Sequence, residues 1–209
     1  MSLINKLNTS RSVILDMLEK RGYSTEKYRE FTINEIEKMY NLHLSSKTIL
    51  GPLDMTIKNE TSTLYIKYIL NMKIRITNIV NLINDLTDNL LINNDTLILL
   101  TNDKIVNSTL DELLESIYQK NNIFIQIFNI DSVMIDITKH IFVPKHELID
   151  QEEKEELFNK YNLTSYTQLP LITKDDPVCK YHGGKRNDIF KIINNSETSG
   201  IYISYRLVQ

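Results

Sequence analysis

Two segments near the end of the chain have a strong strand pattern, and they constrain the fold more than any other feature of the sequence. Residues 188–193 and 201–208 are rich in Ile, Phe, Tyr, Leu and Val, residue types that suit a pleated, half-buried surface. The link between them, residues 194–200, consists of Asn, Ser, Glu, Thr and Gly, several of which form turns. The sequence therefore predicts two strands joined by a turn.

Helix signals precede these strands. Residues 151–161 have a helical pattern in which Leu157 and Phe158 face inward. Asp175-Asp176-Pro177 places proline at the first position of a short helix behind an acidic cap, and Gly183-Gly184 ends that helix. The end of the chain is therefore expected to combine a small sheet with two helices.

The earlier part of the chain interleaves helices and strands. Residues 10–21 predict a helix that ends at Gly22, and residues 25–40 predict a second helix. Thr32-x-x-Glu35 resembles a capping box, at which the second helix can break and restart. The other expected elements are strands at 53–57 and 63–70, a helix at 75–86, a strand at 96–100, a helix capped by Thr109-x-x-Glu112, and strands at 123–128 and 133–137.

Val143-Pro144 marks the boundary between the two parts. We therefore expect an α+β fold with domains at residues 1–139 and 140–209. The length of 209 residues is sufficient for two small domains.

Composition narrows the function only slightly. The net charge is −3, so the net charge of the chain does not attract nucleic acid. A single cysteine, Cys179, cannot form an internal disulfide, which fits a reducing compartment. No stretch approaches the roughly 20 apolar residues of a membrane helix, so no membrane is expected as a partner. The chain has 30 Ile and no Ala, which indicates an A+T-rich genome or a large DNA virus.

Charge is unevenly distributed. Residues 1–75 contain 12 Lys and Arg against 8 Asp and Glu, whereas residues 76–139 contain 3 against 9. The mildly basic first third can lie near a phosphate backbone. The candidate DNA-proximal residues are Lys20, Arg21, Lys27 and Arg29.

Four residues could be assembled into a metal site: His140, His146, Cys179 and His182. Structural zinc sites usually show two close ligand pairs, whereas here only Cys179-x-x-His182 is close. We therefore expect no metal and no cofactor, and interpret the first two histidines as polar anchors around the Val143-Pro144 turn. Cys179 is interpreted as a small buried residue rather than a nucleophile with His182 as its base.

A metal-dependent nuclease is the enzymatic alternative. Such enzymes place one carboxylate at a strand start, here Asp54, and an acidic-x-Lys pair on the next strand. The second strand offers Lys67, but Tyr65 stands where the acid should be, and one carboxylate holds a divalent ion poorly. Gly183-Gly184-Lys185 is a helix stop rather than a phosphate loop. No catalytic residue is expected.

The last seventy residues resemble a known family. A motif runs through His140, Val143, Pro144, Lys145, His146, Ile149, Glu152 and Glu153, and a Ser-Glu-Thr-Ser-Gly turn occupies residues 196–200. Both are similar to the fifth-largest subunit shared by eukaryotic RNA polymerases I, II and III, and to its counterpart in the archaeal enzyme. The departures are Phe142 in place of an aliphatic residue, Ser199 in place of Ala, and Asn194-Asn195 in place of a basic residue and a Pro.

The resemblance implies an N-terminal mixed α/β jaw domain and a small C-terminal mixed-sheet assembly domain with two helices. The assembly domain would dock on the largest polymerase subunit, and the jaw would lie beside downstream double-stranded DNA, which it would contact weakly and non-specifically. The subunit would carry no catalytic residue and bind no small-molecule substrate. Its partner interface would include His140, Val143, Pro144, His146, Glu153, Asp176, Pro177, Tyr181, Ser196, Glu197, Thr198, Tyr205 and Arg206.

Two other functions remain open from the sequence, a nuclease-like DNA-binding protein and a transcription-factor adaptor with the same C-terminal fold. The location follows from the source. A cellular protein of this family would be nuclear, and a version from a large DNA virus would reside in the virion or the cytoplasmic viral factory.

Overall fold

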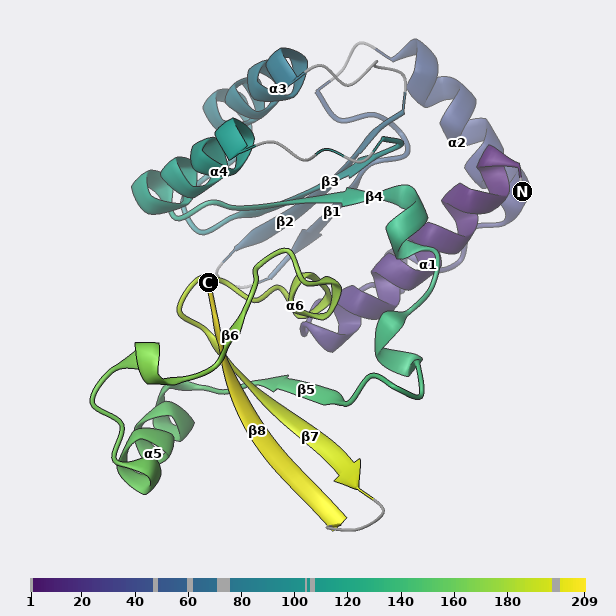
Figure 1. Ribbon diagram of the computed structural model, residues 1–209. Coiled ribbons are helices and arrows are strands. Elements are labelled where there is room, and N and C mark those ends of the chain that lie inside the picture. Colours follow the sequence, from purple (N-terminus) through teal and green to yellow (C-terminus); the bar gives the residue numbers. More distant parts are fainter. Residues whose placement is uncertain are drawn as a thin grey trace. The chain divides into compact units, whose positions relative to one another are not determined.

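The computed structural model describes residues 2–46, 49–59, 62–70, 76–103, 105, 108–196 and 200–209. It divides into two compact units, Met1–Ile135 and Asp136–Gln209 (Figure 1). Each unit combines helices with its own mixed sheet, which confirms the expected α+β class. None of the described helices combines the length and the apolarity that crossing a membrane requires.

The N-terminal unit is built on a sheet with the strand order β1-β2-β3-β4. The antiparallel pair β1 and β2 is followed by two parallel pairs, so β2, β3 and β4 run in the same direction. Parallel neighbours need a crossover, which α3 and α4 supply. The strands are β1 (Met55–Lys58), β2 (Thr63–Ile69), β3 (Thr96–Thr101) and β4 (Phe124–Asn129), and the helices are α3 (Ile76–Asn89) and α4 (Ser108–Asn121).

Helices α3 and α4 cover one face of this sheet (Figure 1). Ile79 and Ile83 of α3 and Leu110 of α4 belong to the same buried cluster as Leu97 and Leu99 of β3. The alternate residues of β3 are also buried, because the opposite face of the sheet is covered as well. This two-sided burial explains why β3 reads as a continuous apolar run rather than an alternating one.

Helix α1 (Leu3–Lys20) starts earlier than the expected residue 10, because the Ser2 side chain accepts a hydrogen bond from the Asn5 amide and caps it. Its end is as expected: Gly22 adopts φ +85°, and the amide of Tyr23 bonds back to the Leu18 carbonyl. The second expected helix does break. The 3-10 turn η1 (Glu26–Tyr28) is followed by α2 (Ile33–Ser45), which starts at a capping box between Thr32 and Glu35.

Two expectations for this unit are wrong. Residues 133–137 form no strand; the structure has the 3-10 turns η2 (Ile130–Val133) and η3 (Ile137–Lys139) there, the second already in the C-terminal unit. Asn129 and Asp136 each accept a hydrogen bond from the amide two residues later, and these local bonds replace a strand ladder. Thr109 does not precede α4, since that helix already begins at Ser108.

Asp54 fixes the turn before β1. Its side chain is 1% exposed and lies 3.5 Å from the Lys67 ammonium. Its carboxylate accepts hydrogen bonds from the amides of Gly51, at 2.7 Å, and Tyr68, at 2.8 Å, while Lys67 also donates to the Ile49 carbonyl. One carboxylate therefore joins the Gly51 turn to β2.

The C-terminal unit contains a second mixed sheet with the order β5-β7-β8-β6, in which only β6 and β8 run parallel. The two expected strands and the two expected helices are confirmed, whereas β5 and β6 were not anticipated. The elements are β5 (Lys145–Leu148), α5 (Gln151–Tyr161), the 3-10 turn η4 (Tyr166–Gln168), β6 (Leu171–Ile172), α6 (Pro177–His182), β7 (Ile189–Ser196) and β8 (Gly200–Val208).

Each face of this sheet has its own small core. Leu157 of α5 packs with Ile189 of β7 and Leu207 of β8. On the other face, Cys179 of α6 packs with Phe190 of β7. Adjacent residues of one strand thus contact different helices, as expected from the two-residue repeat of a strand.

We expect the Asp54→Ala variant to lower the free energy of unfolding of the N-terminal unit by about 2–4 kcal/mol, because it leaves buried amides and a nearly buried ammonium without a carboxylate. The matched control is Asp131→Ala, which removes an ion pair of Asp131, 61% exposed, with Lys6 at 2.7 Å. This surface pair should contribute less than about 1 kcal/mol. Chemical denaturation measures both, and equal losses would contradict the structural role of Asp54.

We expect the single thiol of the chain to be unreactive until the C-terminal unit unfolds. Cys179 is 0% exposed. Burial raises the pKa of the Cys179 thiol from 9.0 to about 12, and the carboxylates of Asp176 and Asp188 act in the same direction. Because the pKa of the thiol is raised in the folded state, the protonated thiol contributes fully to the free energy of unfolding below pH 9. This contribution is lost as the pH rises toward 12. Maleimide labelling at pH 8 with and without denaturant measures this reactivity.

Substitution of Gly184 tests the same packing. A Cβ at Gly184 would lie 2.7 Å from the Cys179 sulfur and 3.0 Å from the Phe190 ring, so Gly184→Ala should destabilise the unit by about 1–3 kcal/mol and accelerate labelling. Arg186→Ala, at an exposed position nearby, should leave both quantities near the wild-type values. Rapid labelling of the native wild-type chain would contradict this picture.

Candidate assembly surface and DNA-proximal residues

The turn before β5 presents apolar side chains to solvent. Ile141 is 89% exposed and Phe142 86% exposed. The His140 ring lies 5.7 Å from the Phe142 ring, and the Phe142 amide donates to His140 Nδ1 at 3.3 Å. His140, itself exposed, therefore orients an aromatic side chain that covers no core residue of its own unit.

His146 anchors the other side of this turn. Its Nδ1 lies 2.8 Å from the Pro144 carbonyl oxygen, and its ring meets Phe190 edge-on, with 5.9 Å between the ring centroids. Val143 and Pro144 are half-buried. These contacts agree with the interpretation of His140 and His146 as anchors of the turn.

The expected interface residues of α6 have mainly a folding role. Asp176 accepts hydrogen bonds from the amides of Val178 and Cys179 and so caps the helix, Pro177 occupies its first turn, and the Tyr181 side chain is buried. The left-handed Gly183 ends the helix as expected. Only Pro177 of this set is exposed.

Tyr205 and Arg206 lie on β8. Tyr205 packs against the core beneath α5, and its ring lies 6.2 Å from that of Tyr161. Arg206 is exposed and donates to the Leu171 carbonyl at 3.3 Å.

The other expected interface positions lie on α5 and at the hairpin turn. Glu153 forms an ion pair with Lys191 at 3.5 Å. The backbone of Ser196 ends β7, whereas Glu197 and Thr198 lie outside the described residues.

The structure reveals exposed apolar residues that sequence reasoning did not select. Tyr202 and Ile203 of β8, Leu171 of β6 and Leu148 of β5 are exposed, and Ile201 is 71% exposed. The signal was present in the strand pattern of residues 201–208, which has apolar residues at both odd and even positions. A strand with apolar residues on both faces needs cover on both faces.

The four candidate metal ligands are not assembled into a site. The rings of His146 and His182 each meet the Phe190 ring edge-on, with centroid distances of 5.9 and 5.8 Å. The Cys179 thiol points to the Gly184 carbonyl oxygen at 3.9 Å. Within the described residues, no group of three or more His, Cys, Asp or Glu side chains could hold a metal ion.

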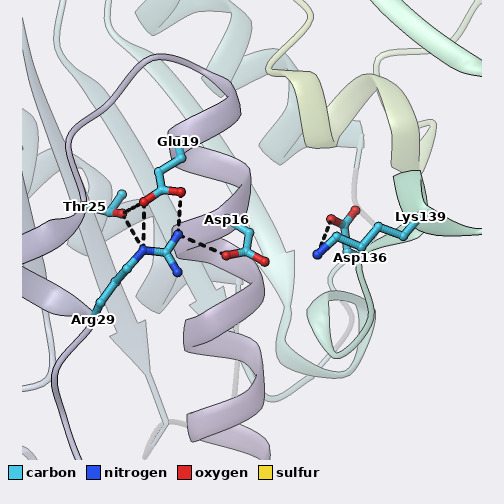
Figure 2. Close-up of polar contacts among 6 residues, drawn as sticks. All are labelled: Asp16, Glu19, Thr25, Arg29, Asp136 and Lys139. Carbon is cyan, nitrogen blue, oxygen red and sulfur yellow. Dashed lines mark hydrogen bonds and ion pairs between the residues drawn. The ribbon is translucent and has the colours of Figure 1, made fainter.

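Among the candidate DNA-proximal residues, Arg29 is held by intramolecular contacts (Figure 2). Its guanidinium lies 3.0 Å from Asp16 and 2.7 Å from Glu19, and it also donates to Thr25 at 3.1 Å. Hydrogen bonds from Arg29, and then from Thr25, hold the pKa of the Glu19 carboxyl below its usual range. Hydrogen bonds to Glu19 and then to Asp16 raise the pKa of Arg29, although burial acts in the opposite direction. This cluster ties the loop after α1 to the helix.

The other three candidate cations are Lys20, Lys27 and Arg21. Lys20 and Lys27 are exposed, and the Lys27 ammonium lies 5.7 Å from the Tyr28 ring centroid. Arg21 is half-buried and donates to the Met17 sulfur at 3.5 Å. Figure 2 also shows an ion pair of the C-terminal unit, Asp136 with Lys139 at 3.5 Å, in which the carboxylate also caps η3.

The nuclease pair, Asp54 and Lys67, is brought together as the strand order predicted. Both groups, however, are occupied by the backbone around the Gly51 turn. Tyr65, at the position of the missing acid, is buried under α3 and α4. The pair therefore stabilises a turn.

The amino-acid sequence is similar to those of known proteins. Residues 135–208 match the family model described as RNA polymerase Rpb5, C-terminal domain. The chain is 30% identical over 205 residues to the "DNA-directed RNA polymerases I, II, and III subunit rpabc1" of Dictyostelium discoideum, and the alignment covers 98% of each chain. It is 49% identical over 76 residues to the Caenorhabditis elegans "DNA-directed RNA polymerases I, II, and III subunit RPABC1", which is 36% of each chain.

An archaeal relative matches a shorter stretch of the chain. The "DNA-directed RNA polymerase subunit Rpo5" of Methanocaldococcus jannaschii is 47% identical over 72 residues, which is 34% of this chain and 91% of the archaeal protein. The similarity is therefore nearly full-length to one relative, and the family model matches the unit that contains the His140 motif. On this evidence the chain belongs to the Rpb5 family of RNA polymerase subunits, which has members in both eukaryotes and archaea.

Proposed function

We propose that the chain is a non-catalytic subunit of a multisubunit DNA-directed RNA polymerase. In this proposal the C-terminal unit is the assembly domain and docks on the largest subunit. The N-terminal unit forms part of the lower jaw beside downstream duplex DNA. The polymerase acts in the nucleus if the source is cellular, and in the virion or the cytoplasmic viral factory if the source is a large DNA virus.

One observation carries the proposal. The archaeal relative is named a polymerase subunit, and 91% of it aligns with 72 residues of this chain. An alignment of this length is close to that of the family-model match at residues 135–208, so we take that protein to be the counterpart of the C-terminal unit and its docking contacts to lie in this unit. The surface of the C-terminal unit is therefore the candidate assembly surface of this chain.

The physical properties of the C-terminal unit support an assembly role. A domain of this size buries only about 60% of the surface of its unfolded chain, so its own core contributes little stability. Its two small cores leave Ile141, Phe142 and Ile201 exposed. Ile141 and Phe142 are neighbours on one turn, and exposed apolar patches mark protein interfaces.

The jaw assignment rests on the N-terminal unit and on the resemblance. Lys20 and Lys27 are exposed, so they can approach phosphates. Contacts of this kind are weak, sequence-independent and sensitive to salt. We therefore test DNA proximity with the two lysines.

Co-purification tests the assembly role. A tagged copy expressed in its natural host should recover the largest polymerase subunit, and its failure to do so would refute the proposed function. The Ile141→Asp variant should recover less of that subunit, by about tenfold or more, because a charge at a packed interface is left unpaired. Circular dichroism should show an unchanged fold, since Ile141 is 89% exposed.

The matched control for this experiment is Ile92→Asp. Ile92 is 73% exposed and belongs to the N-terminal unit. The Ile92→Asp variant should recover as much of the largest subunit as the wild-type chain does. Equal recovery by both variants would exclude Ile141 from the interface.

Salt dependence tests the DNA-proximal lysines. A polymerase assembled with a chain carrying Lys20→Glu and Lys27→Glu should bind downstream duplex more weakly, and the slope of log K against log salt should fall by about 1 for each lost phosphate contact. A chain carrying Lys120→Glu and Lys160→Glu, with the same charge change at exposed positions elsewhere, is the control. Identical slopes for the two doubly substituted enzymes would rule out these contacts.

A further inference from the structure

Strands β7 and β8 continue beyond the short strands that flank them (Figure 1). On the β7 side, β5 pairs only from Phe190 to Ile193. On the β8 side, β6 pairs only with Leu207 and Val208. The part of β8 from Gly200 to Arg206 therefore has β7 on one side, and on its other side it pairs with no strand in the part of the chain that the structure describes.

The direction of each backbone group in β8 follows from the bonds near its end. The amides of Leu207 and Gln209 donate toward β6, to the carbonyls of Pro170 at 2.8 Å and Ile172 at 3.0 Å. The amide of Val208 points the opposite way and donates to the Asp188 carbonyl at 2.8 Å. Because these directions alternate along a strand, the N–H and C=O groups of Ile201, Ile203 and Tyr205 face the outer edge.

Most of this edge lacks the usual protection against pairing. Edge strands of isolated proteins are normally kept short, charged, bulged or interrupted by proline. The opposite edge of the same sheet, β5, is short and carries Lys145 and Glu147, which form an ion pair at 2.6 Å. The free stretch of β8, in contrast, contains no proline, and its one charged residue is Arg206, at the end next to the β6 pairing.

The side chains beside this edge are apolar and exposed. Ile201 and Ile203 lie on one face of β8, and Ile203 is directly opposite Ile193 of β7. Ile201 is 71% and Ile203 41% exposed. A two-stranded ribbon with an apolar face in water is marginally stable, so a third strand that covers these isoleucines would stabilise it.

We propose that the outer edge of β8 receives an extended segment of a polymerase chain. This segment pairs with Ile201, Ile203 and Tyr205 and lies beside the part of β8 that β6 does not reach. The inference rests on the proposed function and specifies its mode of docking as strand addition. The incoming segment has apolar residues at alternate positions, on the face of Ile201 and Ile203. A polymerase chain is favoured over a second copy because the whole of β8 lies in the matched domain of a polymerase subunit family.

The decisive variant is Ile203→Pro, tested in the full chain. Proline removes an amide that faces the outer edge and leaves the bonds to β7 in place, a position that tolerates proline in edge strands. Its control is Ile203→Thr, which keeps the amide and a β-branched side chain. We expect Ile203→Pro to weaken retention in the polymerase by about tenfold more than Ile203→Thr, since a partner carbonyl loses its donor.

Hydrogen exchange supplies a readout that does not depend on substitution. In the free chain the amides of Tyr202 and Ser204, which face β7, should be protected, and those of Ile201, Ile203 and Tyr205 should exchange rapidly. In the assembled polymerase the second group should become protected. Protection of Tyr202 and Ser204 in Ile203→Pro confirms that the hairpin of that variant is intact.

The outcomes separate this inference from the proposed function. Assembly without new protection of the outer amides, or equal retention of Ile203→Pro and Ile203→Thr, overturns strand addition and leaves the subunit role intact. Failure of the wild-type chain to assemble overturns both. Concentration-dependent dimerisation of the free chain that already protects the outer amides assigns the edge to a second copy and overturns the proposed occupant.

Discussion

The antiparallel ladder between β7 and β8 is the interaction on which the C-terminal unit depends. Both of its small cores are built on the two faces of this ladder: Leu157 packs on one side and Cys179 on the other. The flanking strands, β5 and β6, are strands only because β7 and β8 offer them an edge. The same ladder brings Phe190 between His146 and His182, and so connects the turn that carries Ile141 to the sheet. The β7–β8 ladder thus supports both the stability of the C-terminal unit and its candidate assembly surface.

The sequence predicted the elements that carry their own local signals. The helix at residues 151–161 was found through its helical pattern, with Leu157 and Phe158 facing inward, and α6 was found through Asp176, Pro177 and Gly183. Strands β5 and β6 were missed because they are short, and their extended backbone is imposed by tertiary pairing. Residues 133–137 were misread as a strand, since alternation of apolar residues says nothing about the capping bonds that Asn129 and Asp136 form.

For the candidate site, the motif selects residues of the C-terminal unit but cannot rank them. His140 is exposed, whereas Tyr181 of the same motif set is buried. Both belong to one sequence signature because a signature combines residues that make the fold with residues that make the contact. Exposure separates the two groups, and it depends on packing that no local pattern encodes. Arg29 shows a second limit, because the charge pattern placed it near DNA but does not encode its ion pairs with Asp16 and Glu19.

The two units each possess a separate core and a separate sheet, and this has an evolutionary consequence. A substitution inside one core leaves the other intact, so natural selection can act on the halves at different rates. Identity is 30% over nearly the whole length of one relative but 47% over the 72 residues that align with another. A slowly changing module joined to a faster one can serve enzymes whose remaining parts have diverged.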